Sequence, residues 1–132
     1  MELDDEFLNQ INQSNILYLG FKRNVHLYFK CLDTLVLPSY REGFGSVLLE
    51  AAASSLPIIA SNINGPKDFI RNKVNGYLIE PKNIESLKTG LDYFRNNKNK
   101  ISNYAVKALE IVNEKYNVDY VSNLFVRDFL SQ

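Results

Sequence analysis

Apolar residues along this chain fall into short uninterrupted runs that alternate with longer stripes at helical spacing. The short runs end in turn residues, and they predict four strands at residues 16–19, 34–37, 57–60 and 77–79. Strands that are apolar throughout are typical of a parallel sheet that is covered on both faces.

The stripes between these runs predict helices, because their apolar residues recur every three or four positions. The predicted helices are residues 3–12, 25–32, 46–54, 66–71, 84–94, 101–116 and 118–129. Strands that alternate with helices indicate an α/β fold with a doubly wound parallel sheet and helices on both faces. We expect a single domain over residues 1–132, in which about 98–132 forms a C-terminal helical tail.

Composition narrows the classes of function. The 132 residues include 15 Lys and Arg and 15 Asp and Glu, so no basic field attracts nucleic acid or an anionic membrane. No apolar run is long enough to cross a bilayer, and the acidic first residues are unlike a signal peptide. One cysteine and one histidine favour neither a disulfide framework nor a zinc site. A reducing cytoplasm is the default setting.

The glycine-rich stretch after the second predicted strand is the candidate ligand site. Gly43 and Gly45 lie between strand 34–37 and helix 46–54. A loop that leaves the carboxyl end of a strand and opens a helix can hold phosphate on free N–H groups. A second interpretation stays open, because glycines also start helices and form tight turns without any ligand.

Two acids belong to this stretch. Glu42 lies in the loop, and Glu50 follows eight positions later in a helix that is otherwise apolar. A buried acid is costly unless it is hydrogen-bonded, and the polar stripe through Ser46, Glu50 and Ser54 leads back to the loop. On that stripe a carboxylate could accept two ribose hydroxyls. Equally, Glu42 fits a solvated loop acid, and Glu50 fits an acid that faces solvent.

Three further reactive residues have plainer interpretations. His26 has no nucleophile motif beside it and is interpreted as a surface or capping residue. Cys31 is interpreted as a small core residue. Arg41 stands next to Glu42, where a salt bridge at the rim of the site is expected.

The run from Leu37 to Gly45, together with Glu50, resembles the signature of the retaining GT-B glycosyltransferases of family four, or "glycosyl transferases group 1". Flanking blocks are similar to this family in the same order: Tyr18-Leu19-Gly20-Phe21, Leu56-Pro57-Ile58-Ile59-Ala60-Ser61, Asn64-Gly65 and Asn75-Gly76-Tyr77-Leu78-Ile79. Several ordered blocks are far more specific than a pair of glutamates.

The resemblance implies a partial Rossmann-like, donor-binding C-terminal domain. It implies that Glu50 holds the ribose hydroxyls of a nucleotide sugar. It also implies that Glu42, the one residue assigned to catalysis, contacts hydroxyls of the transferred sugar. Donor contacts are further implied for the backbone of Gly43, Phe44, Gly45, Ser46 and Val47, and for Gly20, Phe21 and Lys22 near the base. The implied reaction transfers a hexose-type sugar from a UDP- or GDP-linked donor to an acceptor hydroxyl with retention and without a metal or other cofactor.

The chain also departs from the family pattern. Ser55 stands where the family usually has glycine, so we expect the preceding helix to end without its left-handed cap. The family's Arg and Lys that bind diphosphate, its N-terminal acceptor domain, and two strands between 16–19 and 34–37 have no counterpart. We therefore expect a fragment that is inactive alone. Its partners would be the acceptor domain or an upstream polypeptide, but not nucleic acid.

The incomplete sheet leaves two alternatives. Either strand 16–19 pairs directly with 34–37, or a bare edge favours self-association, to which the apolar residues of helix 118–129 would add. The 61–68 block resembles bacterial members of the family, and this resemblance implies capsule, lipopolysaccharide or other surface polysaccharide synthesis. It places the whole enzyme in the cytoplasm or peripherally at the inner membrane. A non-catalytic module that binds nucleotide sugars or proteins is the alternative function. An epimerase of the same architecture is disfavoured.

Overall fold

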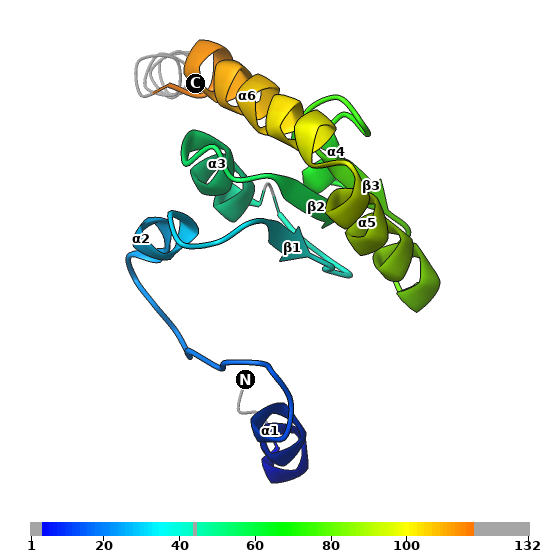
Figure 1. Ribbon diagram of the computed structural model, residues 1–132. Coiled ribbons are helices and arrows are strands. Elements are labelled where there is room, and N and C mark those ends of the chain that lie inside the picture. The colour runs from blue at the N-terminus through cyan, green and yellow to red at the C-terminus, as the bar shows by residue number, and fades with distance from the viewer. Residues whose placement is uncertain (1–3, 44, 118–132) are drawn as a thin grey trace, which may run out of the picture.

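A computed structural model describes residues 4–43 and 45–117 and shows a three-stranded parallel sheet with helices on both faces (Figure 1). The strands β1 (Leu35–Leu37), β2 (Ile58–Ser61) and β3 (Tyr77–Ile79) lie side by side in the order β1-β2-β3. The helices are α1 (Asp5–Asn12), α2 (Val25–Phe29), α3 (Ser46–Ala53), α4 (Pro66–Phe69), α5 (Ile84–Asn96) and α6 (Lys98–Lys115). The predicted α/β class with a parallel sheet is confirmed.

The central strand divides the core into two clusters, because consecutive side chains point to opposite faces of a sheet. Ile58 and Ala60 of β2 pack on one face with α2, α3, α4 and the C-terminal half of α6, and Ile59 packs on the other face with α5 and the N-terminal half of α6. Side chains of β2 are completely buried. The central strand of the sheet is therefore covered on both faces.

Helix α3 ends in a left-handed cap despite the serine. Ser55 has φ 55°, and the N–H groups of Ser55 and Leu56 donate to the carbonyls of Ala52 and Ala51 at 3.0 and 2.9 Å. These two bonds and the buried Leu56 make a Schellman motif, which normally takes glycine at this position. The expectation that the cap is absent is wrong, because the hydrogen bonds and the burial of Leu56 offset the strain of a left-handed serine.

The first of the four predicted strands, at residues 16–19, is not formed. Residues 16–19 are extended, with no strand beside them in the described part of the chain, and they do not pair with 34–37. Helix α2 also stops at Phe29 rather than at 32, where the N–H groups of Cys31 and Leu32 make turn bonds to Tyr28 and Phe29. Cys31 is exposed, so its assignment to the core is wrong.

Two expectations remain. The predicted helix 118–129 and its apolar residues lie outside the described residues. Within the described part, no helix combines the length and apolar character that a membrane crossing needs.

Candidate functional site

The loop of residues 38–45 connects the carboxyl end of β1 to the start of α3, as the sequence predicts. Within it, the hydroxyl of Ser39 donates to Oε1 of Glu42 at 2.8 Å. Glu42 is half-buried and Arg41 is exposed. The partner of Glu42 is therefore the serine, and the predicted salt bridge with Arg41 is not formed. The hydrogen bond fixes one carboxylate oxygen and leaves the other to accept from a ligand.

Gly45 starts α3 in a conformation that favours glycine. Its φ is 75°, its carbonyl accepts from the N–H of Leu48 at 2.8 Å, and no side chain caps the helix. The N–H groups of a first helical turn have no acceptor within the helix. The backbone of Gly45, Ser46 and Val47 therefore offers donors at the end of the sheet where α/β proteins bind ligands.

Gly65 packs against the backbone of the loop 38–45. Its φ is 91°, and a β-carbon at this position would overlap the carbonyl oxygen of Gly43. Asp68 holds the turn, because its Oδ2 accepts from the N–H of Gly65 at 3.3 Å. By contrast, a β-carbon on Gly43 would meet nothing within 4 Å. The close approach between the two loops is therefore made at Gly65. The sequence analysis named Gly65 only as part of a block that resembles the family.

Glu50 is exposed on α3, between exposed Ser46 and partly buried Ser54. The predicted polar stripe is confirmed. Because the Glu50 carboxylate is exposed, it has no cost of burial that a ligand would have to offset. Exposure matches the plainer interpretation of an acid that faces solvent. It also leaves the carboxylate open to a ligand that approaches α3 from solvent.

A cavity of about 290 Å³ opens at the carboxyl ends of all three strands. Its lining includes Pro38 and Tyr40 after β1, Ser61 at the end of β2, and Lys82 after β3. Nζ of Lys82 lies 5.4 Å from the centre of the Tyr40 ring, and the buried hydroxyl of Ser61 has no partner among the described residues. The sequence analysis missed this group, although each member follows a predicted strand and could have been found by that position.

The other predicted donor residues lie elsewhere. Gly20, Phe21 and Lys22 belong to the segment between α1 and α2, which runs outside the body of the molecule (Figure 1). Phe21 is 88% exposed, and the cavity at the carboxyl ends includes none of the three. Phe44 lies outside the described residues. In the part of the chain that is described, no three metal-ligating side chains gather into a cluster.

Comparisons with known proteins match this arrangement. A family model described as "Glycosyl transferases group 1" matches residues 2–110. UDP-Gal:alpha-D-GlcNAc-diphosphoundecaprenol alpha-1,3-galactosyltransferase of Escherichia coli is 38% identical over 79 residues, which cover 60% of this chain and 20% of that protein. Poly(ribitol-phosphate) alpha-N-acetylglucosaminyltransferase of Staphylococcus aureus is 35% identical over 106 residues, which cover 77% of this chain and 22% of that protein.

A solved structure extends the likeness to the fold. The crystal structure of Anabaena Alr3699/HepE in complex with UDP and glucose has a TM-score of 0.89 at 22% identity, and the match covers 96% of this chain and 36% of that chain. This structural likeness supports the fold alone. The matches cover 20–24% of the length of five curated relatives and 6–14% of the length of three others.

Proposed function

We propose, because the chain belongs to the group 1 glycosyltransferases, that it forms the nucleotide-sugar-binding part of an enzyme that transfers a hexose-type sugar with retention. The observation that carries the proposal is the connection from β1 to α3. It leaves the carboxyl end of a parallel strand and opens an uncapped helix at the left-handed Gly45. Such a helix start favours an anionic group, and a diphosphate is the anion that this family's donors contain.

The side chains around this helix start supply the remaining contacts in the proposal. Glu50 accepts the ribose hydroxyls from its exposed position on α3. Glu42, oriented by the hydroxyl of Ser39, accepts a hydroxyl of the transferred sugar. As the glycosidic bond breaks, the diphosphate gains negative charge, which the N–H groups of Gly45, Ser46 and Val47 stabilise. In this proposal transfer needs no metal, and activity of the complete enzyme should survive chelation by EDTA.

The proposed acceptor is a precursor of a bacterial surface polysaccharide. Support comes from two bacterial relatives, whose names give a diphosphoundecaprenol-linked sugar and poly(ribitol-phosphate) as their acceptors. Because the chain spans about a fifth of its relatives, an acceptor site requires polypeptide beyond these 132 residues. We expect the chain by itself to bind the donor nucleotide in the cytoplasm without transferring the sugar.

Titration calorimetry of the pure chain with UDP, GDP and UDP-glucose tests the binding step. Glu50→Ala should weaken binding more than about tenfold, because a carboxylate that accepts two hydroxyls contributes over 1 kcal/mol. Glu110→Ala is the matched control, since Glu110 is also an exposed helical glutamate but lies on α6. Equal affinity of both variants, or no binding by the unmodified chain, would contradict the proposed site.

Turnover separates the enzyme from the alternative module. Sugar transfer by the pure 132-residue chain would refute the expectation that it is inactive alone. Restoration of transfer by a separately expressed upstream polypeptide would support the enzyme. Nucleotide binding that never leads to transfer, even in such a mixture, would instead support a non-catalytic module that binds nucleotide sugars.

A further inference from the structure

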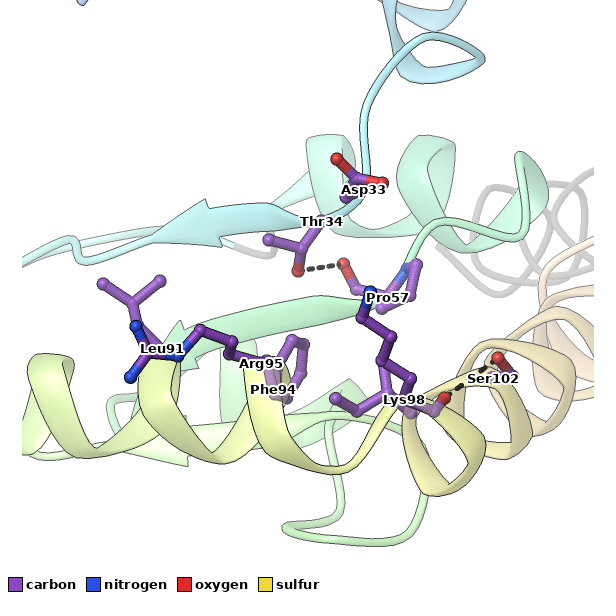
Figure 2. Close-up of a pocket in the computed structure, with 9 residues that line it drawn as sticks. Asp33, Thr34, Pro57, Leu91, Phe94, Arg95, Lys98 and Ser102 are labelled. Carbon is purple, nitrogen blue, oxygen red and sulfur yellow. Dashed lines mark hydrogen bonds between the residues drawn. The ribbon is translucent and has the colours of Figure 1, made fainter. Parts of the chain in front are cut away.

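Two cavities lie at opposite ends of the sheet, and the hydroxyl groups in their linings differ. The larger cavity, of about 460 Å³, lies at the amino ends of β1 and β2. Figure 2 shows that its hydroxyls already have acceptors within the protein. Thr34 donates to the carbonyl of Pro57 at 2.9 Å, and Ser102 donates to the carbonyl of Lys98 at 3.0 Å. These hydroxyls are therefore satisfied without a ligand.

The smaller cavity, at the carboxyl ends of the strands, has a hydroxyl that lacks a partner. Ser61 is the last residue of β2 and belongs to the lining of this cavity. It is 1% exposed, and its Oγ has no hydrogen-bond partner among the described residues. A buried polar group without a partner destabilises the folded state. A ligand that bonds to Ser61 would remove this cost, so the hydroxyl favours a ligand with hydrogen-bonding groups.

The charged side chains in this lining are one acid and one base. Glu80 and Lys82 both follow β3, and no ion pair joins them in the described part of the chain. Oε1 of Glu80 lies 3.5 Å from Nδ2 of Asn62, which leaves the other carboxylate oxygen to accept from a ligand. The lining is therefore neutral overall. A phosphate would meet the like charge of Glu80, whereas sugar hydroxyls can donate to Glu80 and accept from Lys82.

Tyr40 adds an exposed aromatic ring to the cavity. The residue is 65% exposed, and Nζ of Lys82 lies 5.4 Å from the ring centre, within the range of a cation–π contact. This contact favours one position of a ring that offers a flat apolar surface. Pro38, Ile79 and Leu87 add further apolar area to the lining. A pyranose ring has C–H groups on its faces and hydroxyls around its rim, so it matches both the apolar and the polar parts.

The size and place of the cavity also suit a single sugar ring. Its volume of about 290 Å³ lies at the lower end of the range for small-molecule sites. Pro38 and Tyr40 of the lining belong to the loop 38–45, which carries Glu42. A sugar in the cavity therefore lies beside the loop that is assigned to the transferred sugar.

We propose that this cavity binds a neutral pyranose unit of the acceptor saccharide. The hydroxyl of Ser61 and the ammonium of Lys82 donate to its hydroxyls. Glu80 accepts from another hydroxyl, and Tyr40 packs against a C–H face. The assignment of this sugar to the acceptor rests on the proposed function, and the remaining acceptor contacts require further polypeptide.

NMR titration of the isotope-labelled 132-residue chain with methyl α-glucopyranoside and methyl α-galactopyranoside tests the site. NMR detects the weak binding expected of a single sugar ring. The amide signals of Ser61, Glu80 and Lys82 should shift and saturate with at least one of the two sugars. Inorganic phosphate, titrated in the same way, should give no saturable shifts at these positions.

Two variants with matched controls identify the residues that bind the sugar. Ser61→Ala should weaken binding about fivefold, the usual effect of one neutral hydrogen bond. Ser102→Ala is its control, because Ser102 lines the other cavity (Figure 2). Lys82→Gln should weaken binding at least as much, and Lys88→Gln is its control, because Lys88 is also exposed but lies on α5 outside the lining. Urea denaturation should show no loss of stability in Ser61→Ala, because the substitution removes an unsatisfied group.

Titration of the same sample with UDP separates this inference from the proposed function. UDP binding without saturable sugar shifts would overturn the sugar site and leave the nucleotide site standing. Sugar binding without UDP binding would contradict the nucleotide site and support the cavity. Equal sugar affinity of Ser61→Ala and Ser102→Ala, or saturable shifts with phosphate but with neither sugar, would also overturn the inference.

Discussion

At the scale of single residues, Ser55 adopts a strained left-handed backbone conformation that a substitution can relieve. It adopts φ 55° at the end of α3, whereas Ser54 beside it has φ −90°. Ser55→Gly should raise the free energy of unfolding by about 1 kcal/mol, because glycine has no β-carbon that disfavours the left-handed region. Ser54→Gly is the control and should lower stability. Urea denaturation measures both changes, and a destabilised Ser55→Gly variant would contradict the assigned conformation.

Gly65 and Gly43 separate support of the loop from binding by the loop. Gly65→Ala should cost about 2 kcal/mol or more, because its β-carbon would overlap the carbonyl of Gly43 in a left-handed turn. Gly43→Ala should leave stability within about 0.5 kcal/mol, since its β-carbon enters open space. Chemical denaturation of both variants checks this prediction, and equal stabilities would show that the two loops are not in contact.

Only some of the residues that form the site could be predicted from the sequence. The positions of Glu42 and Gly45 follow from a strand, a loop and a helix that are adjacent in the chain. The contact between Gly65 and Gly43, and the group of Tyr40, Ser61 and Lys82, join the ends of different strands. Such contacts depend on how the strands pair, which the local pattern does not specify. The roles of Glu42 and Glu50 stay predictions.

At the scale of elements, the pattern predicted the order of helices and strands between residues 25 and 117. Residues 16–19 show why a pattern can fail. They have the composition of a strand, but strand formation needs a partner, and none of the described residues forms a strand beside them. The end of α2 was missed for a related reason. The chain must turn at Cys31 and Leu32 to enter β1, and that requirement overrides the helical spacing of the apolar residues.

The packing of α5 against α6 has a pH dependence of its own. The hydroxyls of Tyr93 and Tyr104 lie 2.9 Å apart. Burial first, and then this hydrogen bond, raise the pKa of Tyr104 from 10.0 to about 12. The folded protein therefore keeps a proton that the unfolded chain loses above about pH 10, so the folded state loses stability as pH rises toward about 12.

A comparison of variants isolates this effect. The urea midpoint of the unmodified chain should fall more steeply than that of Tyr104→Phe between about pH 9 and about pH 11.5. Tyr18→Phe is the control, because Tyr18 is 57% exposed and should keep the steep dependence. Parallel curves for the unmodified chain and Tyr104→Phe would show that Tyr104 titrates normally.

At the scale of the whole molecule, the buried core begins late in the chain. Among the described residues, Ile11 is the only core member before Phe29. Helix α6 joins the two clusters, since its first half packs with Ile59 and its second half with Leu48 and Ala52. Cohesion therefore comes from the sheet, α3, α5 and α6, while the segment before α2 contributes little to it. The sequence pattern alone does not reveal this imbalance, because the apolar residues of 16–19 resemble core residues.

Two deletions test where the cooperative unit begins. A chain that starts at Asn24 should melt within about 5 °C of the full chain, because among the described core residues the deletion removes Ile11 alone. A chain that starts at Asp33 also loses Phe29, which is 3% exposed, and the loss should cost about 3 kcal/mol or more. Differential scanning calorimetry measures both chains. If the longer deletion melts like the shorter one, Phe29 does not anchor α2; if the shorter one unfolds without a cooperative transition, the segment before α2 belongs to the core.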